Sequence, residues 1–159
     1  MATFKGTATF IMPGATELVS TKQPKDHITK TIGELEVEML PMRSETQTGA
    51  TLPLFHMQVR YRQGTMDKAK WDAMKPSLGS RPPKVYDGVG RSIPSSNLSR
   101  LTNEPDGAVL ADYIAPGRSP AARGGGGGTG DPDHYDLEVP VGSDREVKVP
   151  FEFTDLPMP

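Results

Sequence analysis

The sequence has no cysteine, which excludes disulfides, thiolate zinc sites and a cysteine nucleophile. It also lacks any run near the roughly 18 apolar residues that a membrane-spanning helix needs. The first residues, MATFKG, have no apolar core of the kind that marks a secretory signal. We therefore expect no membrane insertion, and either a protein that is not exported or a signal encoded outside this sequence.

An excess of charge of one sign is lacking too, because 18 lysines and arginines stand against 20 aspartates and glutamates, for a net charge of −2. Without a basic run, binding to nucleic acid or to an anionic membrane is not favoured. Long helices are not expected, because 16 prolines and 17 glycines interrupt the chain. A chain of 159 residues is nevertheless long enough to bury a core.

What the sequence does have is alternation of apolar and polar residues, the pattern of strands with one buried face. It is clearest on either side of the turn at residues 142–144, at Tyr135, Leu137, Val139, Val141, Val147, Val149, Phe151 and Phe153. We predict that these residues form a two-stranded antiparallel hairpin. Its apolar face is expected to be half-buried against another layer of protein.

The same alternation predicts strands at residues 3–12, 33–40 and 54–62. The last two can fold back on each other, because the polar residues 43–49 lie between them. Glutamates on the exposed face of one strand and arginines on the exposed face of the other then offer cross-strand ion pairs. Residues 15–30 are polar and are predicted to be a solvated connection.

These strands predict an all-β protein, an antiparallel β-sandwich of immunoglobulin-like or jelly-roll-like type, with one short helix and long loops rich in proline and glycine. We expect a single domain over residues 1–159. Residues 1–30 are a candidate extended N-terminal arm. Residues 95–132 are predicted to be a long glycine-rich loop, within which 108–114 is a short strand or a helical turn.

Residues 65–75 are the best candidate for the helix, with Thr65 as its cap and Pro76 as its stop signal. The single tryptophan, Trp71, falls inside it and either plugs the edge of the sandwich or faces a partner. Residues 84–93 are predicted to be two short extended pieces about an Asp87-Gly88 turn.

Five consecutive glycines at residues 124–128 invite a nucleotide-binding interpretation. A phosphate loop needs a buried strand before it and a helix after it, whereas PAAR precedes the glycine-rich run 124–130 and DPD follows it, so phosphate binding is not predicted. A loop this long is disordered, functional or ordered by contacts with another chain. Gly124 and Gly128 are therefore candidate partner contacts.

Asp131, Asp133 and Asp136 are candidate calcium ligands, because spaced carboxylates on a loop can bind this ion. The full EF-hand pattern is absent, and a turn solvated by aspartates explains the same residues. The histidines, His27, His56 and His134, are far apart in the sequence. We predict no catalytic residue and no cofactor; an enzyme would need a pocket that gathers at least two histidines with carboxylates.

The run KVYDGVGRSI at residues 84–93 and the ending VPFEFTDLPMP at residues 149–159 resemble the latter part of immunoglobulin-like β-sandwich modules in bacterial envelope proteins of unknown function. The resemblance extends over residues 33–159, and the glycine-rich insertion departs from it. It implies a β-sandwich fold and carries over no catalytic residue.

Two functions from different classes follow. The first is a non-catalytic structural protein whose arms and loops contact neighbouring protein subunits, by self-association or in a larger complex such as a virion-like shell or tail, a filament or a surface layer. The alternative is an immunoglobulin-like ligand-binding or accessory module of a bacterial envelope protein, which works through loops at one end of the sandwich.

Overall fold

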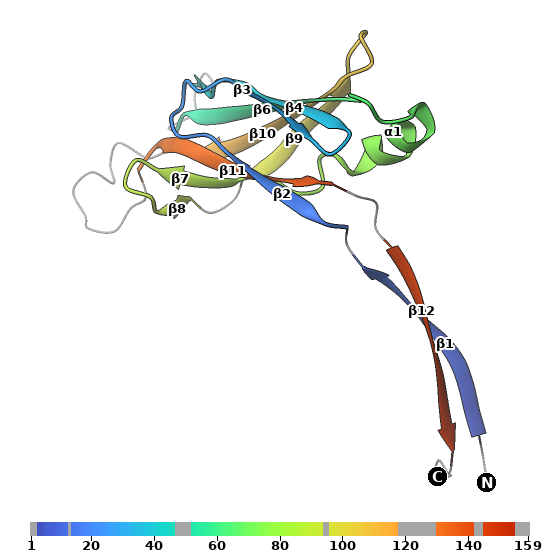
Figure 1. Ribbon diagram of the computed structural model, residues 1–159. Coiled ribbons are helices and arrows are strands. Elements are labelled where there is room, and N and C mark those ends of the chain that lie inside the picture. Colours follow the sequence, from blue (N-terminus) through green and yellow to red (C-terminus); the bar gives the residue numbers. More distant parts are fainter. Residues whose placement is uncertain are drawn as a thin grey trace. The chain divides into compact units, whose positions relative to one another are not determined.

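The computed structural model describes residues 3–12, 14–46, 52–93, 96–117, 130–141 and 145–154 (Figure 1). The chain divides into two compact units. Residues 16–141 form one unit, and residues 1–15 together with 142–159 form the other. This differs from the single domain that we expected, because both ends of the chain pair with each other.

The larger sheet of the first unit is antiparallel throughout, with the order β3-β4-β6-β10-β9 and with β5 pairing to β6. Its strands are β3 (Ile28–Ile32), β4 (Leu35–Met39), β5 (Arg43–Glu45), β6 (Leu54–Arg62), β9 (Asn97–Asn103) and β10 (Val109–Pro116). The smaller sheet has the order β2-β11-β7-β8. Its strands are β2 (Thr16–Ser20), β7 (Lys84–Asp87), β8 (Ser92–Ile93) and β11 (Pro132–Pro140).

The two sheets lie one over the other as the layers of a sandwich (Figure 1), which confirms the all-β fold class. Strands β4, β6, β10 and β11 alternate buried and partly exposed side chains, as period-two patterning requires. The core between the layers holds three tyrosines, Tyr61, Tyr113 and Tyr135, each at most 2% exposed. Two of their hydroxyls donate hydrogen bonds to backbone carbonyl oxygens, that of Tyr113 to Leu78 and that of Tyr135 to Leu40. Burial raises the pKa of all three phenols.

The predicted pairing of residues 33–40 with 54–62 is confirmed. Strands β4 and β6 are antiparallel, with Glu36 opposite Arg62 and Glu38 opposite Arg60. Both cross-strand ion pairs form, at 3.0 Å between Arg62 Nη1 and Glu36 Oε1 and at 2.9 Å between Arg60 Nη1 and Glu38 Oε2. The expected charge pattern therefore fixes the register as well as the faces.

The helix α1 (Lys68–Met74) lies at one end of the sandwich (Figure 1) and leads into a 3₁₀ turn, η1 (Lys75–Ser77). The predicted cap was wrong. The helix begins after Asp67, whose carboxylate accepts a hydrogen bond from the backbone N–H of Lys70 at 2.9 Å. Asp67 is the better cap because an ionised carboxylate at a helix N-terminus also interacts with the helix dipole.

Two stretches that we expected to be loops contain strands. Residues 15–30 include β2 and part of β3, and residues 95–132 include β9 and β10. Strand β10 settles the choice at 108–114 in favour of a strand, with four of its side chains buried in alternation. Strand β9 exposes all seven of its residues and is held by its pairing to β10. A strand with no apolar face has no alternation that a sequence could reveal.

The second unit is a two-stranded antiparallel ribbon, β1 (Thr3–Met12) and β12 (Arg145–Thr154). Strand β1 agrees with the prediction, but the predicted hairpin of residues 135–153 is wrong. Its first half is β11, which pairs with β2 and β7 in the sandwich, and its second half is β12, which pairs with β1. Alternation identifies which face of a strand is apolar but not which strand lies beside it.

Candidate interaction surface

One face of the β1–β12 ribbon is apolar along its whole length. Residues directly opposite each other in the ladder point to the same side. The register pairs Phe4 with Phe153, Gly6 with Phe151, Ala8 with Val149 and Phe10 with Val147. Together with Met12, which also lies on this side of β1, these residues define the apolar face of the ribbon.

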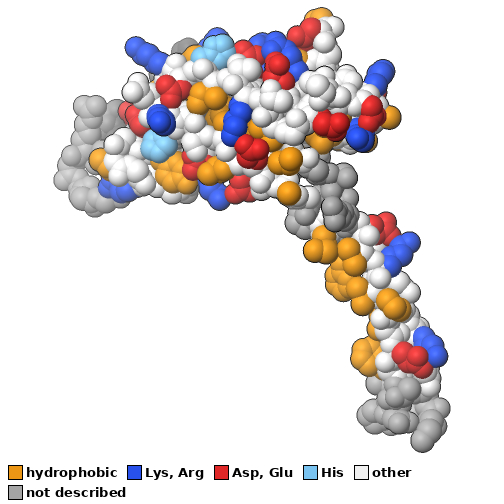
Figure 2. All heavy atoms as spheres, viewed as in Figure 1, with side chains coloured by type: hydrophobic (Ala, Val, Ile, Leu, Met, Phe, Trp, Pro, Cys, Tyr) orange, Lys and Arg blue, Asp and Glu red, His pale blue; other side chains and the backbone are white. Residues whose placement is uncertain are grey.

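The large side chains of the apolar face are exposed. Phe4, Phe10, Met12 and Phe153 each expose between 53% and 56% of their surface, and Val149 exposes 45%. Figure 2 shows hydrophobic side chains gathered along the ribbon. Within the ribbon no second layer covers them, because the unit consists of one two-stranded sheet. Of the four residues expected to be half-buried on this face of β12, Val147 and Phe151 are partly buried, whereas Val149 and Phe153 are exposed, and the unit itself supplies no second layer.

A cluster of three rings holds one end of the apolar face in place. The Phe151 ring lies 5.7 Å from the Phe4 ring and 5.6 Å from the Phe153 ring, measured between centroids. It extends across the ribbon over Gly6, where an added Cβ would come within 2.5 Å of the Phe151 ring. A glycine opposite an aromatic residue gives the ring a flat backbone to lie on. The apolar face is thus ordered even though it is exposed.

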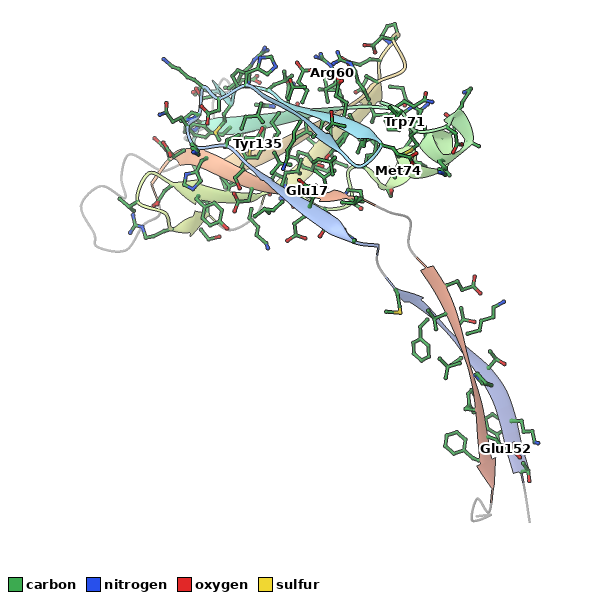
Figure 3. All side chains as sticks on the ribbon, in the orientation of Figure 1. Glu17, Arg60, Trp71, Met74, Tyr135 and Glu152 are labelled. Atoms are coloured by element: carbon green, nitrogen blue, oxygen red, sulfur yellow. The ribbon has the colours of Figure 1, made fainter. Side chains whose placement is uncertain are left out.

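The opposite face of the ribbon is polar. Lys5 and Glu152, which are opposite each other in the ladder, form an ion pair at 2.9 Å, and Lys148 pairs with Glu146 at 3.2 Å (Figure 3 labels Glu152). Thr7 and Thr9 lie on the same side. The ribbon therefore has one face suited to water and one suited to protein, which is the distribution expected of a sheet with one covered face.

An uncovered ribbon of this kind is not stable on its own. Two-stranded hairpins are marginal in water, and a third strand or a packed layer is needed for independent stability. Each phenylalanine that becomes fully covered contributes about 1.5–3 kcal/mol, reduced by the part already buried. The apolar face therefore identifies the ribbon as the candidate interaction surface.

The charged side chains on the outer face of the larger sheet form a network with satisfied partners. Arg60, labelled in Figure 3, donates through Nε and Nη2 to Glu104 at 2.6 and 3.2 Å, and through Nη1 to Glu38. These hydrogen bonds raise the pKa of Arg60. Burial alone would raise the pKa of Glu38, but the hydrogen bonds from His27 and Arg60 lower it below its ordinary value. The network stabilises the sheet and leaves no group aimed at a ligand.

Each histidine contacts carboxylates of its own. His27 lies 2.8 Å from Glu38, and His134 lies 3.1 Å from Asp133. His56 lies between two carboxylates, with Nδ1 3.1 Å from Asp112 and Nε2 3.3 Å from Glu45. None of these interactions joins two histidines.

The three aspartates proposed for calcium are not brought together. Asp133 pairs with His134, while Asp136 lies opposite Ser20 and Lys84 in the sheet. Across the part of the chain that the structure describes, no group of three histidine, aspartate or glutamate side chains could hold a metal ion. Asp131 lies just before β11.

The tryptophan is buried. Trp71 exposes 2% of its surface and belongs to the core cluster, with the Lys75 ammonium 5.5 Å from its ring centroid. Figure 3 shows it on α1 together with Met74, which packs against the same core. Packing accounts for this residue, and little of the ring is left for a partner. Gly124 and Gly128 lie outside the described residues.

Sequence reasoning missed the anchoring role of Asp87. Its carboxylate is 1% exposed and accepts hydrogen bonds from the backbone N–H groups of Val89, Arg91 and Gly130 and from Arg91 Nε. The sequence marks Asp87 as a turn residue, but its partner Gly130 is 43 residues away. That contact depends on the fold and has no local signal.

None of the helices described is long and apolar enough to cross a membrane. Comparison of the chain with protein-family models, with curated proteins and with solved structures finds no match.

Proposed function

We propose that this chain is a non-catalytic structural protein, a β-sandwich subunit that binds a neighbouring protein through the apolar face of its β1–β12 ribbon. The larger assembly is of the kind formed by a virion-like shell or tail, a filament or a surface layer. The observation that carries the proposal is the exposure of Phe4, Phe10 and Phe153 on one side of the ribbon, at 53–56% each.

Exposed apolar surface of this extent and continuity supports an interaction role. Single hydrophobic side chains scattered over a surface need no explanation, but contiguous apolar patches mark sites of protein interaction. Here the patch runs along a whole unit and is backed by a polar face with its own ion pairs. The ribbon includes residues 3–12 of the predicted N-terminal arm.

The size of the native species tests this proposal. A tagged chain is expressed in its native cells, and the size of the species that contains it is measured in a gentle extract. We expect the wild type to elute at an apparent mass well above the 17.2 kDa of one chain, and Phe10→Glu to elute at the mass of a single chain. Thr9→Glu, which adds the same charge to the polar face, is the matched control and should behave as wild type.

If wild type and Phe10→Glu both elute as single chains, the ribbon binds no stable neighbour and the proposal fails. That result favours the alternative function, an immunoglobulin-like module that binds ligands through loops at the end of the sandwich.

A further inference from the structure

We propose that the neighbour is a second copy of this chain, and that two β1–β12 ribbons pack face to face through their apolar faces. This inference rests on the proposed function and names the partner of the same surface. The paired ribbons form a small two-layer sandwich, with the layers about 10 Å apart, as in other stacked sheets. A two-fold pair of this kind uses the same patch on both copies.

The exposed area fits a pair of ribbons. An aromatic side chain buries roughly 150–250 Å² when fully covered, so the half-exposed Phe4, Phe10 and Phe153 offer about 300 Å² between them. With Met12 and Val149, which are similarly exposed, one ribbon offers roughly 450 Å² and two ribbons about 900 Å². This approaches the 1,000 Å² or so that marks the lower limit of a specific interface. In such a pair, the apolar face of each ribbon covers the apolar face of the other.

The charge distribution favours an identical partner. In a two-fold pair, a charge near the axis meets its own copy, and such a like-charge contact is costly. Arg145 is opposite Met12 in the ladder, at one end of the apolar face, and the other charged residues of the two strands, Lys5, Glu146, Lys148 and Glu152, lie on the opposite face. A two-fold axis near Ala8 places the Arg145 positions of the two copies at opposite ends of the paired ribbons, so a second copy meets this face without a like-charge contact.

The strand edges show that a partner covers the face of the ribbon rather than extending its sheet. Pro150 lies within β12 and has no N–H to donate. Proline inside a sheet is confined to edge strands, and charged residues such as Lys5 and Lys148 also protect edges from pairing. Strand β12 is suited to remain an edge, so the apolar face is the surface left for a neighbour.

Sedimentation equilibrium of the purified full chain, from low to high micromolar concentration, tests the pairing. We expect a reversible monomer–dimer equilibrium for wild type and for the polar-face control Thr9→Glu. Phe10→Glu and Phe153→Glu, toward the two ends of the apolar face, should each raise the dimer Kd by roughly 30-fold or more, because each replaces a buried aromatic anchor by a charge. Circular dichroism confirms that each variant keeps the sandwich.

Single-cysteine variants give a second measurement that adds no charge to the apolar face. They can be used because the sequence has no cysteine of its own. Ala8 lies near the middle of β1, where a two-fold axis brings its two copies close. We expect Ala8→Cys to be cross-linked between copies by a short bismaleimide. Thr9→Cys, on the polar face, should remain uncross-linked at the same concentration.

Each other outcome overturns the pairing in a recognisable way. A wild type that stays monomeric excludes the second copy; the native extract then decides separately whether the ribbon binds a different protein. A dimer that survives both glutamate substitutions places the interface elsewhere. If the wild type forms an oligomer larger than a dimer and Phe10→Glu dissociates it, the ribbon is an interaction surface, but the two-copy arrangement is excluded.

Discussion

The carboxylate of Asp87 accepts a hydrogen bond from the backbone N–H of Gly130 at 2.8 Å, which ties the β7–β8 turn to the residue that leads into β11. Its remaining bonds come from Val89 and Arg91 within the turn. All of these groups are donors, so the site is built for a carboxylate that only accepts. Asp87→Asn would turn an NH₂ group toward N–H donors.

We expect Asp87→Asn to lower the Tm by roughly 5–10 °C, because at least one buried donor loses its acceptor. Asp106→Asn is the matched control, since Asp106 accepts one turn hydrogen bond, from Ala108, and its side chain is 56% exposed. Thermal unfolding followed by circular dichroism measures both. Equal shifts for the two variants would contradict an anchoring role for Asp87.

The same site predicts a pH dependence. The Gly130 N–H, aided by Arg91 and Val89 and opposed by burial, holds the pKa of Asp87 well below its ordinary value of 3.8. A lowered folded pKa means that the ionised carboxylate stabilises the fold above the unfolded pKa, and that this contribution is lost as the pH falls through the folded pKa. The Tm difference between wild type and Asp87→Asn should be full at neutral pH and shrink below about pH 4.

Gly64 predicts a large effect for a small substitution. Its φ is +57°, and an added Cβ would lie 2.3 Å from the carbonyl oxygen of Glu34, which accepts the Thr65 N–H. Gly107 also has a positive φ, of +85°, but has open space around it. Gly107→Ala should cost about 1 kcal/mol of unfolding free energy, as left-handed backbone does. Gly64→Ala should cost at least ~2 kcal/mol more in urea unfolding, and equal costs would contradict the clash.

Trp71 should behave as a core residue. Trp71→Ala is expected to cost about 3–5 kcal/mol, the range for removing a buried aromatic side chain. Met74→Ala, at a partly buried position of the same helix, should cost less. Urea unfolding measures both, and the emission of the single tryptophan in the wild type should shift to the red on unfolding. A Trp71→Ala variant of wild-type stability would instead assign this residue to a partner.

Arg60 should contribute more to the free energy of unfolding than its neighbour Arg62. The Arg60 side chain is 24% exposed and balances Glu38 and Glu104, whereas Arg62 is 41% exposed. Arg60→Gln should cost about 1–2 kcal/mol, because Glu104 loses its cation and Glu38 keeps only His27 and Arg62. Arg62→Gln should cost less than about 1 kcal/mol. Combining Arg60→Gln with Glu104→Gln should recover part of the loss, and strict additivity of the two substitutions would count against the coupling.

The sequence predicted what local patterns determine. Alternation located β1, β4 and β6, and the Glu36–Arg62 and Glu38–Arg60 pairs followed from charges on facing strands. Prediction from alternation failed where a strand buries too few side chains to show the period of two. Strand β2 buries Val19 and strand β3 buries Ile32, one fully buried residue each, so both resemble polar linkers.

The ribbon was predicted in its apolar pattern but not in its strand pairing. The apolar positions of β12 were correct, yet the nearest strand in sequence, β11, was taken as their partner, whereas the true partner begins at Thr3. Pairing between strands so far apart in sequence leaves no local trace. The exposure of Phe10 and Phe153 follows from that pairing, and therefore could not be read from composition or periodicity either.

The ribbon joins β1 to β12, the first and the last of the strands that the structure describes. Thr3 meets Thr154 and Met12 meets Arg145, so β1 has no partner until β12 has left the ribosome. Until then the phenylalanines of β1 lie on an unpaired segment, and the apolar face of the ribbon is incomplete. Under the proposed function, association through this face must wait until β12 has been made.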